Sequence, residues 1–330
     1  MNRSVLIMRN WSALGTAAYA VLSISFLIAL YLPWPDELSV IPTVAEFSPR
    51  WAILTPLPVL LLITRSWVQC SLLLLVTITN LSLILGLNLA LPPATGVGSP
   101  EIKVGTYNVG GGLIHPNAVL EYYRVKELDA LLLQETQSFR MEAFLPAEFN
   151  YECQSRLCIL SHHEVASLEA LSRRVLGGWG NYIARFDLRA RGQTIAIYNL
   201  HLNTARHELE LIGPSFDFWG KASSRYSNRR LESQIASAMV AQHPTPQRHT
   251  LIAGDFNLTV QGLIYRKYWS SWVNVFGEVG NGFGYTKRTR IIGARIDHVL
   301  HSNNMVAVHV DVGSSLGGDH RPLTATMTLQ

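Results

Sequence analysis

Polar side chains that can bind metal ions or move protons recur beyond residue 100, at the points where apolar segments end. The segments before them are short and rich in Val, Ile, Leu and Ala, a composition typical of buried β-strands. Strand ends are rigid positions, so side chains there can meet at one edge of a sheet. The residues are Asn108, Glu135, His201, Asp255, Asn257, Asp297, Asp319 and His320.

The oxygen donors in this set suit a hard divalent cation. Mg²⁺ prefers oxygen ligands, keeps several waters and takes only one or two protein carboxylates. We therefore expect Asn108 and Glu135 to bind Mg²⁺, with Asp319 as a further or water-mediated ligand. Mn²⁺ accepts the same kinds of donor and is the alternative ion.

The other members of the set suit proton transfer and phosphate binding. Asp297 can orient His320 and hold its imidazole in one tautomer. Asp255 can accept a proton from an attacking water, while Asn257 hydrogen-bonds phosphoryl oxygens. A single histidine such as His201 is more often a hydrogen-bonded core residue than a site residue, so its assignment to the site depends on the whole set.

Strands and helices intermix over the region that must position these residues, which predicts sheets in the core and helices outside. Helical spacing predicts helices over 117–128 and 228–241, and the second has Leu231, Ile235 and Met239 on one face. The predicted strands cover 102–107, 130–134, 158–160, 182–188, 194–200, 250–253, 295–300 and 323–329.

Six short motifs surround the polar residues. They are Thr106-Tyr107-Asn108, Leu133-Gln134-Glu135, Asn199-Leu200-His201-Leu202, Gly254-Asp255-Phe256-Asn257, Arg295-Ile296-Asp297-His298 and Gly318-Asp319-His320-Arg321-Pro322. In this order they resemble the endonuclease/exonuclease/phosphatase superfamily, over residues 101–330. Tyr107 and Gly318 stand where Trp and Ser are common in that superfamily, and neither change removes a ligand or a proton carrier.

The resemblance implies an α/β fold, a four-layer sandwich of two mixed β-sheets flanked by helices, with the site at one end. The resemblance also implies the roles given above: Asn108, Glu135 and Asp319 bind the metal ion, while Asp255, Asn257, Asp297 and His320 act on the water and the phosphate. By the same likeness, His201 joins His320 in contacting the scissile phosphate.

The charge distribution divides the chain in two. Charged residues make up only 15% of the sequence, whereas about a quarter is usual for soluble proteins. The deficit lies in residues 1–99, which contain four Arg, no Lys and three acids. We therefore expect residues 1–98 to form a membrane anchor and linker, and residues 99–330 to form the catalytic domain.

Apolar runs near 11–32, 51–64 and 67–91 predict about three transmembrane helices. The middle run is short and is broken by Pro56 and Pro58, so a re-entrant or interfacial segment is the alternative. The runs contain no interior charge that would mark a transport pathway, which argues against a transporter.

The positively charged residues of the anchor orient it. Arg3, Arg9 and Arg65 should lie in the cytoplasm. Three spans then place the catalytic domain outside a bacterial inner, or plasma, membrane, whereas two spans would leave it in the cytoplasm. Cys153 and Cys158 flank a predicted hairpin turn, where a disulfide would need an oxidising compartment and two free thiols are the alternative.

Basic and aromatic residues interleave in the stretches 203–230, 265–269 and 287–290. Such stretches suit single-stranded nucleic acid and equally suit anionic phospholipid head groups. A solvated loop whose aromatic side chains fold back onto the core is the third interpretation. The candidate substrate contacts are Arg225, Arg229 and Arg230.

These observations predict a membrane-anchored, divalent-metal-dependent hydrolase of ester bonds that cleaves a phosphodiester with a metal-positioned water. Nucleic acid is the first expected substrate. A phospholipid or small-molecule phosphodiesterase or phosphatase of the same family is the alternative, and a non-catalytic membrane-tethered binding module is a further one. The expected partners are a phosphate ester and the lipid bilayer, with no obligate protein partner.

Overall fold

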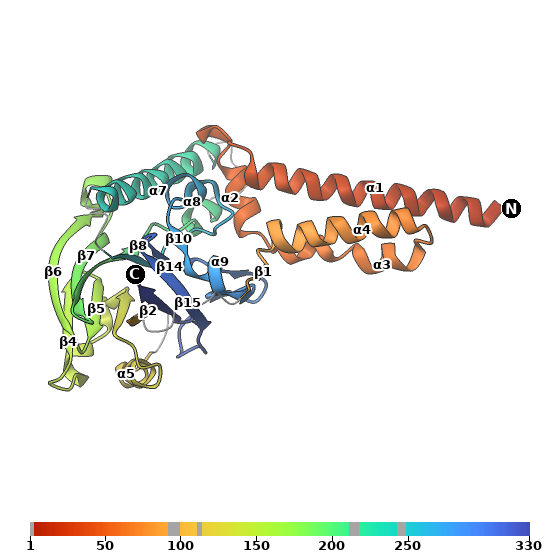
Figure 1. Cartoon of the computed structure of the whole chain (residues 1–330). Coiled ribbons are helices and arrows are strands. Elements are labelled where there is room, and N and C mark those ends of the chain that lie inside the picture. The colour runs from red at the N-terminus through yellow and green to blue at the C-terminus, as the bar shows by residue number, and fades with distance from the viewer. Residues whose placement is uncertain (1–2, 92–99, 111–113, 211–217, 243–248) are drawn as a thin grey trace.

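Two six-stranded sheets pack face to face, and a helical arm projects from the sandwich they form (Figure 1). This computed structural model describes residues 3–91, 100–110, 114–210, 218–242 and 249–330. The first sheet has the order β15 (Met305–Val312), β16 (Leu323–Leu329), β2 (Glu101–Asn108), β3 (Ala130–Gln134), β5 (Leu157–Ser161) and β4 (Asn150–Gln154). The second has the order β10 (Val273–Asn274), β14 (Asp297–His301), β9 (Thr250–Asp255), β8 (Gln193–His201), β7 (Asn181–Ala190) and β6 (Glu164–Ser172).

Both sheets are mixed. β2 pairs in parallel with β3, and β8 pairs in parallel with β9, while the other neighbours are antiparallel. The parallel pairs bring the carboxyl ends of four strands to the same end of the sandwich, because each sheet contributes one such pair. This end carries the predicted site residues.

An apolar core fills the space between the sheets, with Leu132 and Ile159 of the first sheet packed in one cluster with Phe186, Ile197 and Leu251 of the second. Side chains alternate along each strand, so the opposite faces are free to bind helices. α5 (Pro116–Val125) covers the outer face of the first sheet. α7 (Phe218–Ala241) and α8 (Leu263–Tyr268) cover that of the second, which confirms the predicted four-layer sandwich.

The predicted strands and helices are present, but the four edge strands of the two sheets, β4, β6, β10 and β15, lie outside the predicted strand ranges. β6 lacks the apolar run that marks a buried strand in a sequence. β15 begins with the apolar run Met305–Val308, so the sequence does mark this strand and the prediction missed it. Shorter elements complete the domain: η4 (Thr136–Ser138), η5 (Met141–Phe144), η6 (Arg173–Leu176), α6 (Arg206–Leu209), α9 (Val275–Val279), β11 (Asn281–Gly282), β12 (Lys287–Arg288) and β13 (Gly293–Ala294).

The predicted apolar face of α7 is right for Met239, which is buried, and for Ile235, which packs against the core, but wrong for Leu231. Leu231 is 38% exposed, and the buried face also contains Ala222, Tyr226, Arg229 and Ala236. The sequence pattern misleads here because charged residues such as Arg229 sit on the buried face, where other charges neutralise them.

The helical arm consists of α1 (Arg3–Tyr31), α3 (Leu57–Ile63) and α4 (Trp67–Thr79), which the π-helical turn η3 (Asn80–Ile84) prolongs (Figure 1). Stretches of 22 residues in α1 and of 18 residues from Trp67 to Ile84 are apolar and long enough to cross a membrane. The two segments run parallel, because Ser12 Oγ donates to Gln69 Oε1 near one end and Asn80 Nδ2 donates to Tyr19 Oη and Ser23 Oγ further along. The last apolar segment ends earlier than the predicted residue 91, because β1 (Asn88–Leu89) pairs with β11 beside the sandwich.

Residues 36–54, here called the collar, connect α1 to α3 and lie against the sandwich. The collar contains η1 (Asp36–Leu38), α2 (Val40–Phe47) and η2 (Arg50–Leu54). α2 joins the segment of residues 50–63 at a bend of 77°, so the middle apolar run is a broken span or a re-entrant loop rather than one straight helix. Its first residues, 51–54, belong to the collar. The predicted linker, residues 92–99, lies outside the described residues.

Candidate active site

The strand register brings the predicted residues together at one end of the sandwich. His201, at the end of β8, stands opposite Asp255 at the end of β9. Asp297, at the start of the antiparallel β14, stands opposite Asp255 on its other side. Asn108 of β2 is paired with Gln134 of β3, which directly precedes Glu135. Strand pairing therefore fixes four of the predicted site residues and puts Glu135 directly beyond the end of β3.

One half of the site joins the two sheets through Asn108. Its amide nitrogen donates to Glu135 Oε1 and to Asp255 Oδ2, both at 3.0 Å. Glu135 has the left-handed backbone angle φ of 59°, which turns its side chain back over the strand end. Gly110 leaves room for it, since a Cβ there would lie 1.9 Å from Glu135 Oε2.

His201 approaches the same carboxylates from the second sheet. Its Nε2 lies 3.3 Å from Glu135 Oε1 and 3.9 Å from Asp255 Oδ2. The hydrogen bond from His201 lowers the pKa of Glu135 to about 2, against the opposing effect of burial. Glu135 is therefore a carboxylate at neutral pH, as a metal ligand must be.

The other half of the site is a buried Asp–His pair. His320 Nδ1 lies 2.9 Å from Asp297 Oδ2, and its Nε2 lies 3.6 Å from Asp255 Oδ2. Burial by itself would lower the pKa of His320, but Asp297 and Asp255 outweigh it and raise that pKa to about 9. Burial also raises the pKa of Asp255, which makes this carboxylate a stronger base.

Asn257 is held beside this pair by its own backbone. It has φ of 50°, its N–H donates to Asp255 Oδ1 at 2.9 Å, and its Nδ2 donates to the carbonyl of Leu202 at 2.9 Å. Gly254 permits the close approach of β9 to β8, because a Cβ there would lie 2.0 Å from the carbonyl oxygen of Leu200. The Gly-Asp-x-Asn motif therefore sets the backbone conformation at the end of β9 and also supplies the side chains of the site.

Lys287 reaches the site from the β12–β13 hairpin. Its ammonium lies 2.9 Å from His320 Nε2 and 3.0 Å from Asp319 Oδ2. Asp319 is 46% exposed, and its other oxygen lies 4.0 Å from His320 Nε2. The sequence placed Lys287 only in a basic cluster, because nothing in the local pattern shows that the hairpin folds over His320. The structure adds this cation to the candidate phosphate-binding groups.

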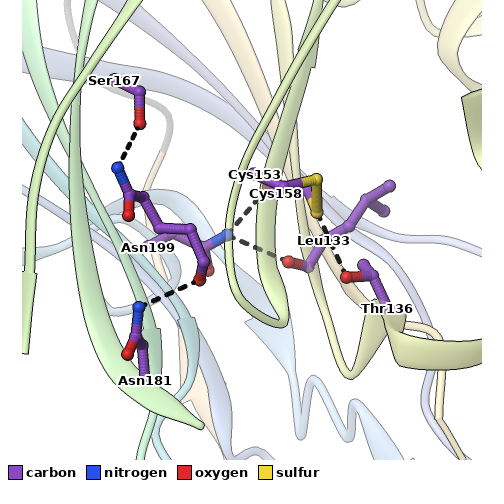
Figure 2. Close-up of a disulfide and its surroundings, with 8 residues drawn as sticks. Leu133, Thr136, Cys153, Cys158, Ser167, Asn181 and Asn199 are labelled. Carbon is purple, nitrogen blue, oxygen red and sulfur yellow. Dashed lines mark hydrogen bonds between the residues drawn. A yellow bond between two sulfur atoms is a disulfide. The ribbon is translucent and has the colours of Figure 1, made fainter. Parts of the chain in front are cut away.

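A buried amide network supports the site from below. Asn199 Nδ2 donates to the carbonyls of Leu133 and Cys158 at 3.0 and 2.9 Å, and its Oδ1 accepts from Gln134 Nε2 at 2.8 Å. These bonds tie β8 of one sheet to β3 and β5 of the other, beside the Cys153–Cys158 disulfide (Figure 2). The sequence motifs contained Gln134 and Asn199, but residue types alone gave them no role.

Two of the three predicted substrate-binding arginines serve the collar instead. Arg229 is 1% exposed and donates to both carboxylate oxygens of Glu208, at 2.9 and 3.0 Å, and to Thr43 of the collar. Arg230 pairs with Asp36 of the collar at 2.7 Å. Arg225 is exposed on α7, and its role stays a prediction. Residues 211–217 of the same basic and aromatic stretch lie outside the described part of the chain.

A second group of acid and imidazole side chains, Asp129, His162 and His163, is a structural cluster. The carboxylate of Asp129 already accepts from His163 at 2.8 Å and from Arg191 at 3.0 Å. Arg191 neutralises the negative charge of Asp129, so this carboxylate has little need of a metal ion. His298 is likewise structural: it is buried, bonds the carbonyl of Leu258, and burial lowers its pKa to about 4.

The donor set of the site fits a hard divalent cation. The carboxylates of Glu135, Asp255 and Asp319 supply oxygen atoms, and Asp255, Asp297 and His320 place their donor atoms within 4.8 Å of one another. The amide nitrogen of Asn108 bridges Glu135 and Asp255, while its oxygen accepts from the N–H of Gly110. A cation beside the two carboxylates would offset their mutual repulsion.

Comparisons with known proteins agree with this geometry. Residues 105–320 match the sequence model of the Endonuclease/Exonuclease/phosphatase family. A solved structure of an endonuclease/exonuclease/phosphatase family protein from Bacteroides thetaiotaomicron is 15% identical, with a TM-score of 0.50 over 70% of this chain and 99% of that one. An AP endonuclease from Archaeoglobus fulgidus is 16% identical, with a TM-score of 0.52 over 68% and 98%.

Truncated TDP2 from Caenorhabditis elegans is 16% identical, with a TM-score of 0.51 over 69% of this chain and 97% of that one. At these identities the likeness to solved structures is one of fold. No curated protein matches the chain.

Proposed function

Because the chain belongs to the endonuclease/exonuclease/phosphatase family, we propose that it is a membrane-anchored, divalent-metal-dependent phosphoesterase that hydrolyses a phosphodiester. One observation carries this proposal. Asp255 Oδ2 lies 3.0 Å from Asn108, 3.6 Å from His320 and 3.9 Å from His201, so a base, two imidazoles and an amide surround one point.

The residues have distinct parts in the proposed reaction. Asp255, whose pKa burial raises, accepts a proton from the attacking water, whose oxygen then forms the new bond to phosphorus. His201 and the cationic His320 donate hydrogen bonds to the phosphoryl oxygens, and Lys287 adds a further cation beside His320. Asp297 holds His320 in place, so its Nε2–H can give its proton to the leaving oxygen as the bond from that oxygen to phosphorus breaks.

Asn108 and Glu135, with Asp319, would hold the metal ion, for which Mg²⁺ is the proposed species and Mn²⁺ the alternative. When bound, the ion supplies Lewis-acid stabilisation of the negative charge that develops on phosphoryl oxygens. Asn257 would orient the water or a phosphoryl oxygen from its fixed place beside Asp255.

The anchor is proposed to cross a bacterial plasma membrane, with residues 1–98 as anchor and linker and residues 99–330 as the catalytic domain on the outer side. Three features support this orientation. The N-terminal end of α1 and the turn between α3 and α4, which contains Arg65, lie at the end of the arm remote from the sandwich (Figure 1). The Cys153–Cys158 disulfide agrees with an oxidising compartment.

Nucleic acid is the substrate expected from the sequence, but contacts of the collar favour a phospholipid as the second candidate. Collar residue Glu46 accepts a hydrogen bond at 2.7 Å from the backbone N–H of Thr259, two residues after Asn257. Collar residue Trp51 donates at 2.7 Å to the carbonyl of Ile291, in the hairpin that carries Lys287. The rim of the site is thus attached to the segment that leads into the membrane.

The test uses the full chain in lipid nanodiscs with Mg²⁺ or with chelator. Single-stranded DNA, RNA, phospholipid and a soluble chromogenic phosphodiester are supplied in parallel. We expect chelator-sensitive cleavage that Glu135→Ala and His320→Ala abolish, while His309→Ala, on the exposed face of β15, serves as the matched control. Cleavage that persists in both site variants would contradict the proposed mechanism.

A further inference from the structure

A pocket of about 410 Å³ lies where the helical arm meets the catalytic domain, apart from the candidate active site. It is formed by the end of α1, the first collar residues, α7 and α8, which lie close together at this end of the arm (Figure 1). Its aromatic and basic lining residues include Tyr31, Trp34, Arg230, Arg266, Lys267 and Tyr268.

The pocket carries more positive than negative charge. Its one lining acid, Asp36, is already paired with Arg230 at 2.7 Å. Arg266 places its guanidinium 4.6 Å from the centre of the Tyr31 ring and donates to the carbonyl of Tyr31 at 3.0 Å, so it retains its full charge. Lys267 is exposed, lies 5.4 Å from the Tyr268 ring, and has no carboxylate partner among the described residues.

The pocket is level with the end of an apolar helix. The apolar stretch of α1 ends at Tyr31, which itself lines the pocket together with Trp34. Tyr and Trp concentrate at the level of lipid head groups, where one end of the ring is apolar and the other is wet. If α1 crosses the bilayer, the pocket opens at the depth of the lipid phosphates on the side of the catalytic domain.

We propose that this pocket binds the phosphate head group of an anionic phospholipid of that leaflet. Lys267 and Arg266 supply the charge, and the rings of Tyr31 and Trp34 pack beside the glycerol and the upper acyl chain. The bound lipid would fix the end of α1 against α8 and so hold the catalytic domain at a constant height above the membrane. The inference rests on the membrane anchoring in the proposed function, but not on any turnover.

The experiment reconstitutes the full chain in nanodiscs of phosphatidylcholine with a minor share of phosphatidylglycerol, and adds chelator so that no metal-dependent turnover occurs. Native mass spectrometry then measures the ratio of the two lipids that remain on the ejected protein. A basic residue near an anionic surface contributes about 1 kcal/mol, which is about fivefold in binding. We therefore expect Lys267→Gln to lower the retained ratio of phosphatidylglycerol to phosphatidylcholine about fivefold.

Two variants control for charge and for folding. Lys267→Arg should keep the wild-type ratio, because it preserves the cation. Lys126→Gln, which removes an equal charge from the far side of the domain where Lys126 pairs with Asp311, should also leave it unchanged. Lys267 is exposed, so its substitution should leave the thermal midpoint in pure phosphatidylcholine discs unaltered.

An unchanged lipid ratio in Lys267→Gln would overturn the proposal. Binding of inorganic phosphate that depends on Lys267, with no change in the lipid ratio, would also overturn it, since the pocket would then bind a soluble anion rather than a lipid. Cleavage of the soluble phosphodiester by Lys267→Gln in Mg²⁺ is measured separately. The loss of lipid selectivity with intact cleavage therefore distinguishes this inference from the proposed catalytic function.

Discussion

Replacing Asp297 by Asn tests the arrangement of the site most directly, because it changes a charge and preserves the shape. Both Asp297 oxygens accept from His320 Nδ1, at 2.9 and 3.1 Å, and both side chains are about 1% exposed. An Asn side chain has one acceptor oxygen instead of two. Its NH₂ group can also donate to Nδ1 of His320, which favours the wrong tautomer of the imidazole.

The expected magnitude follows from these contacts. A hydrogen bond to a charged group contributes roughly 1.5–3 kcal/mol, and each 1.36 kcal/mol is about tenfold in rate. Asp297→Asn should therefore lower kcat/KM between about 10-fold and 150-fold. Asp297 is also a main reason why the pKa of His320 is raised to about 9. A raised pKa keeps the imidazole cationic below that pH, so the variant should lose activity at a lower pH on the alkaline side.

The assay measures kcat/KM of the full chain on a soluble chromogenic phosphodiester across pH, with Mg²⁺ in excess. The matched control is Glu278→Gln, because Glu278 makes an equivalent 2.9 Å contact with His301 of the same strand, away from the site. We expect the control to remain within about twofold of wild type. If Asp297→Asn stays within about threefold as well, with an unchanged pH profile, Asp297 does not act through His320.

Three further predictions concern stability, each measured by unfolding of the detergent-solubilised full chain. Asn199→Leu leaves two buried carbonyls and the Gln134 amide without a hydrogen-bond partner, so the free energy of unfolding should fall by roughly 2–4 kcal/mol. A loss smaller than that of an exposed substitution such as Asn228→Leu would contradict a stabilising role of this hydrogen-bond network. Replacing both Cys153 and Cys158 by Ser opens a bridge between residues five apart, which should cost about 2 kcal/mol, and reductant should then have no further effect. The pKa of His298 is about 4 in the folded state against an ordinary 6.5, so the unfolded chain binds more protons between these values and stability should fall as pH drops from 6.5 towards 4. His298→Gln should remove about 3 kcal/mol of this dependence, and an equal slope in the variant would refute the assignment.

The strand ends that carry the site could be predicted because buried strands are local patterns. Short apolar runs such as 130–134 and 250–253 are strands in the structure, and the polar residue that follows each one lies at the site. The edge strand β6 lacks such a run, whereas β15 begins with the apolar run Met305–Val308, which the prediction missed. The buried face of α7 was also hard to predict from the pattern of apolar residues, because Arg229 is buried and Leu231 is exposed.

The positions of charged groups depended on contacts between distant parts of the chain. Arg229 was expected at the substrate, but it meets Glu208 and Thr43, the latter 186 residues away in sequence. Lys287 lies 33 residues before His320 and meets it only because the β12–β13 hairpin folds over the site. The sequence does not show which acid or imidazole a Lys or Arg side chain will contact, so the role of that side chain is known only from the packing of the folded chain.

By itself, the sequence determined the residue types at the strand ends, the apolar segments of the anchor and the division between anchor and catalytic domain as an expectation. These features depend on composition and on short periodic patterns, which a chain carries before it folds. Only the tertiary structure decided that the collar takes up two of the arginines, that Lys287 joins the site, and that the end of α1 forms a basic pocket with α8. Each of these contacts joins residues that are far apart in sequence. Such a contact becomes favourable only when folding buries both partners together, so the sequence alone does not show it.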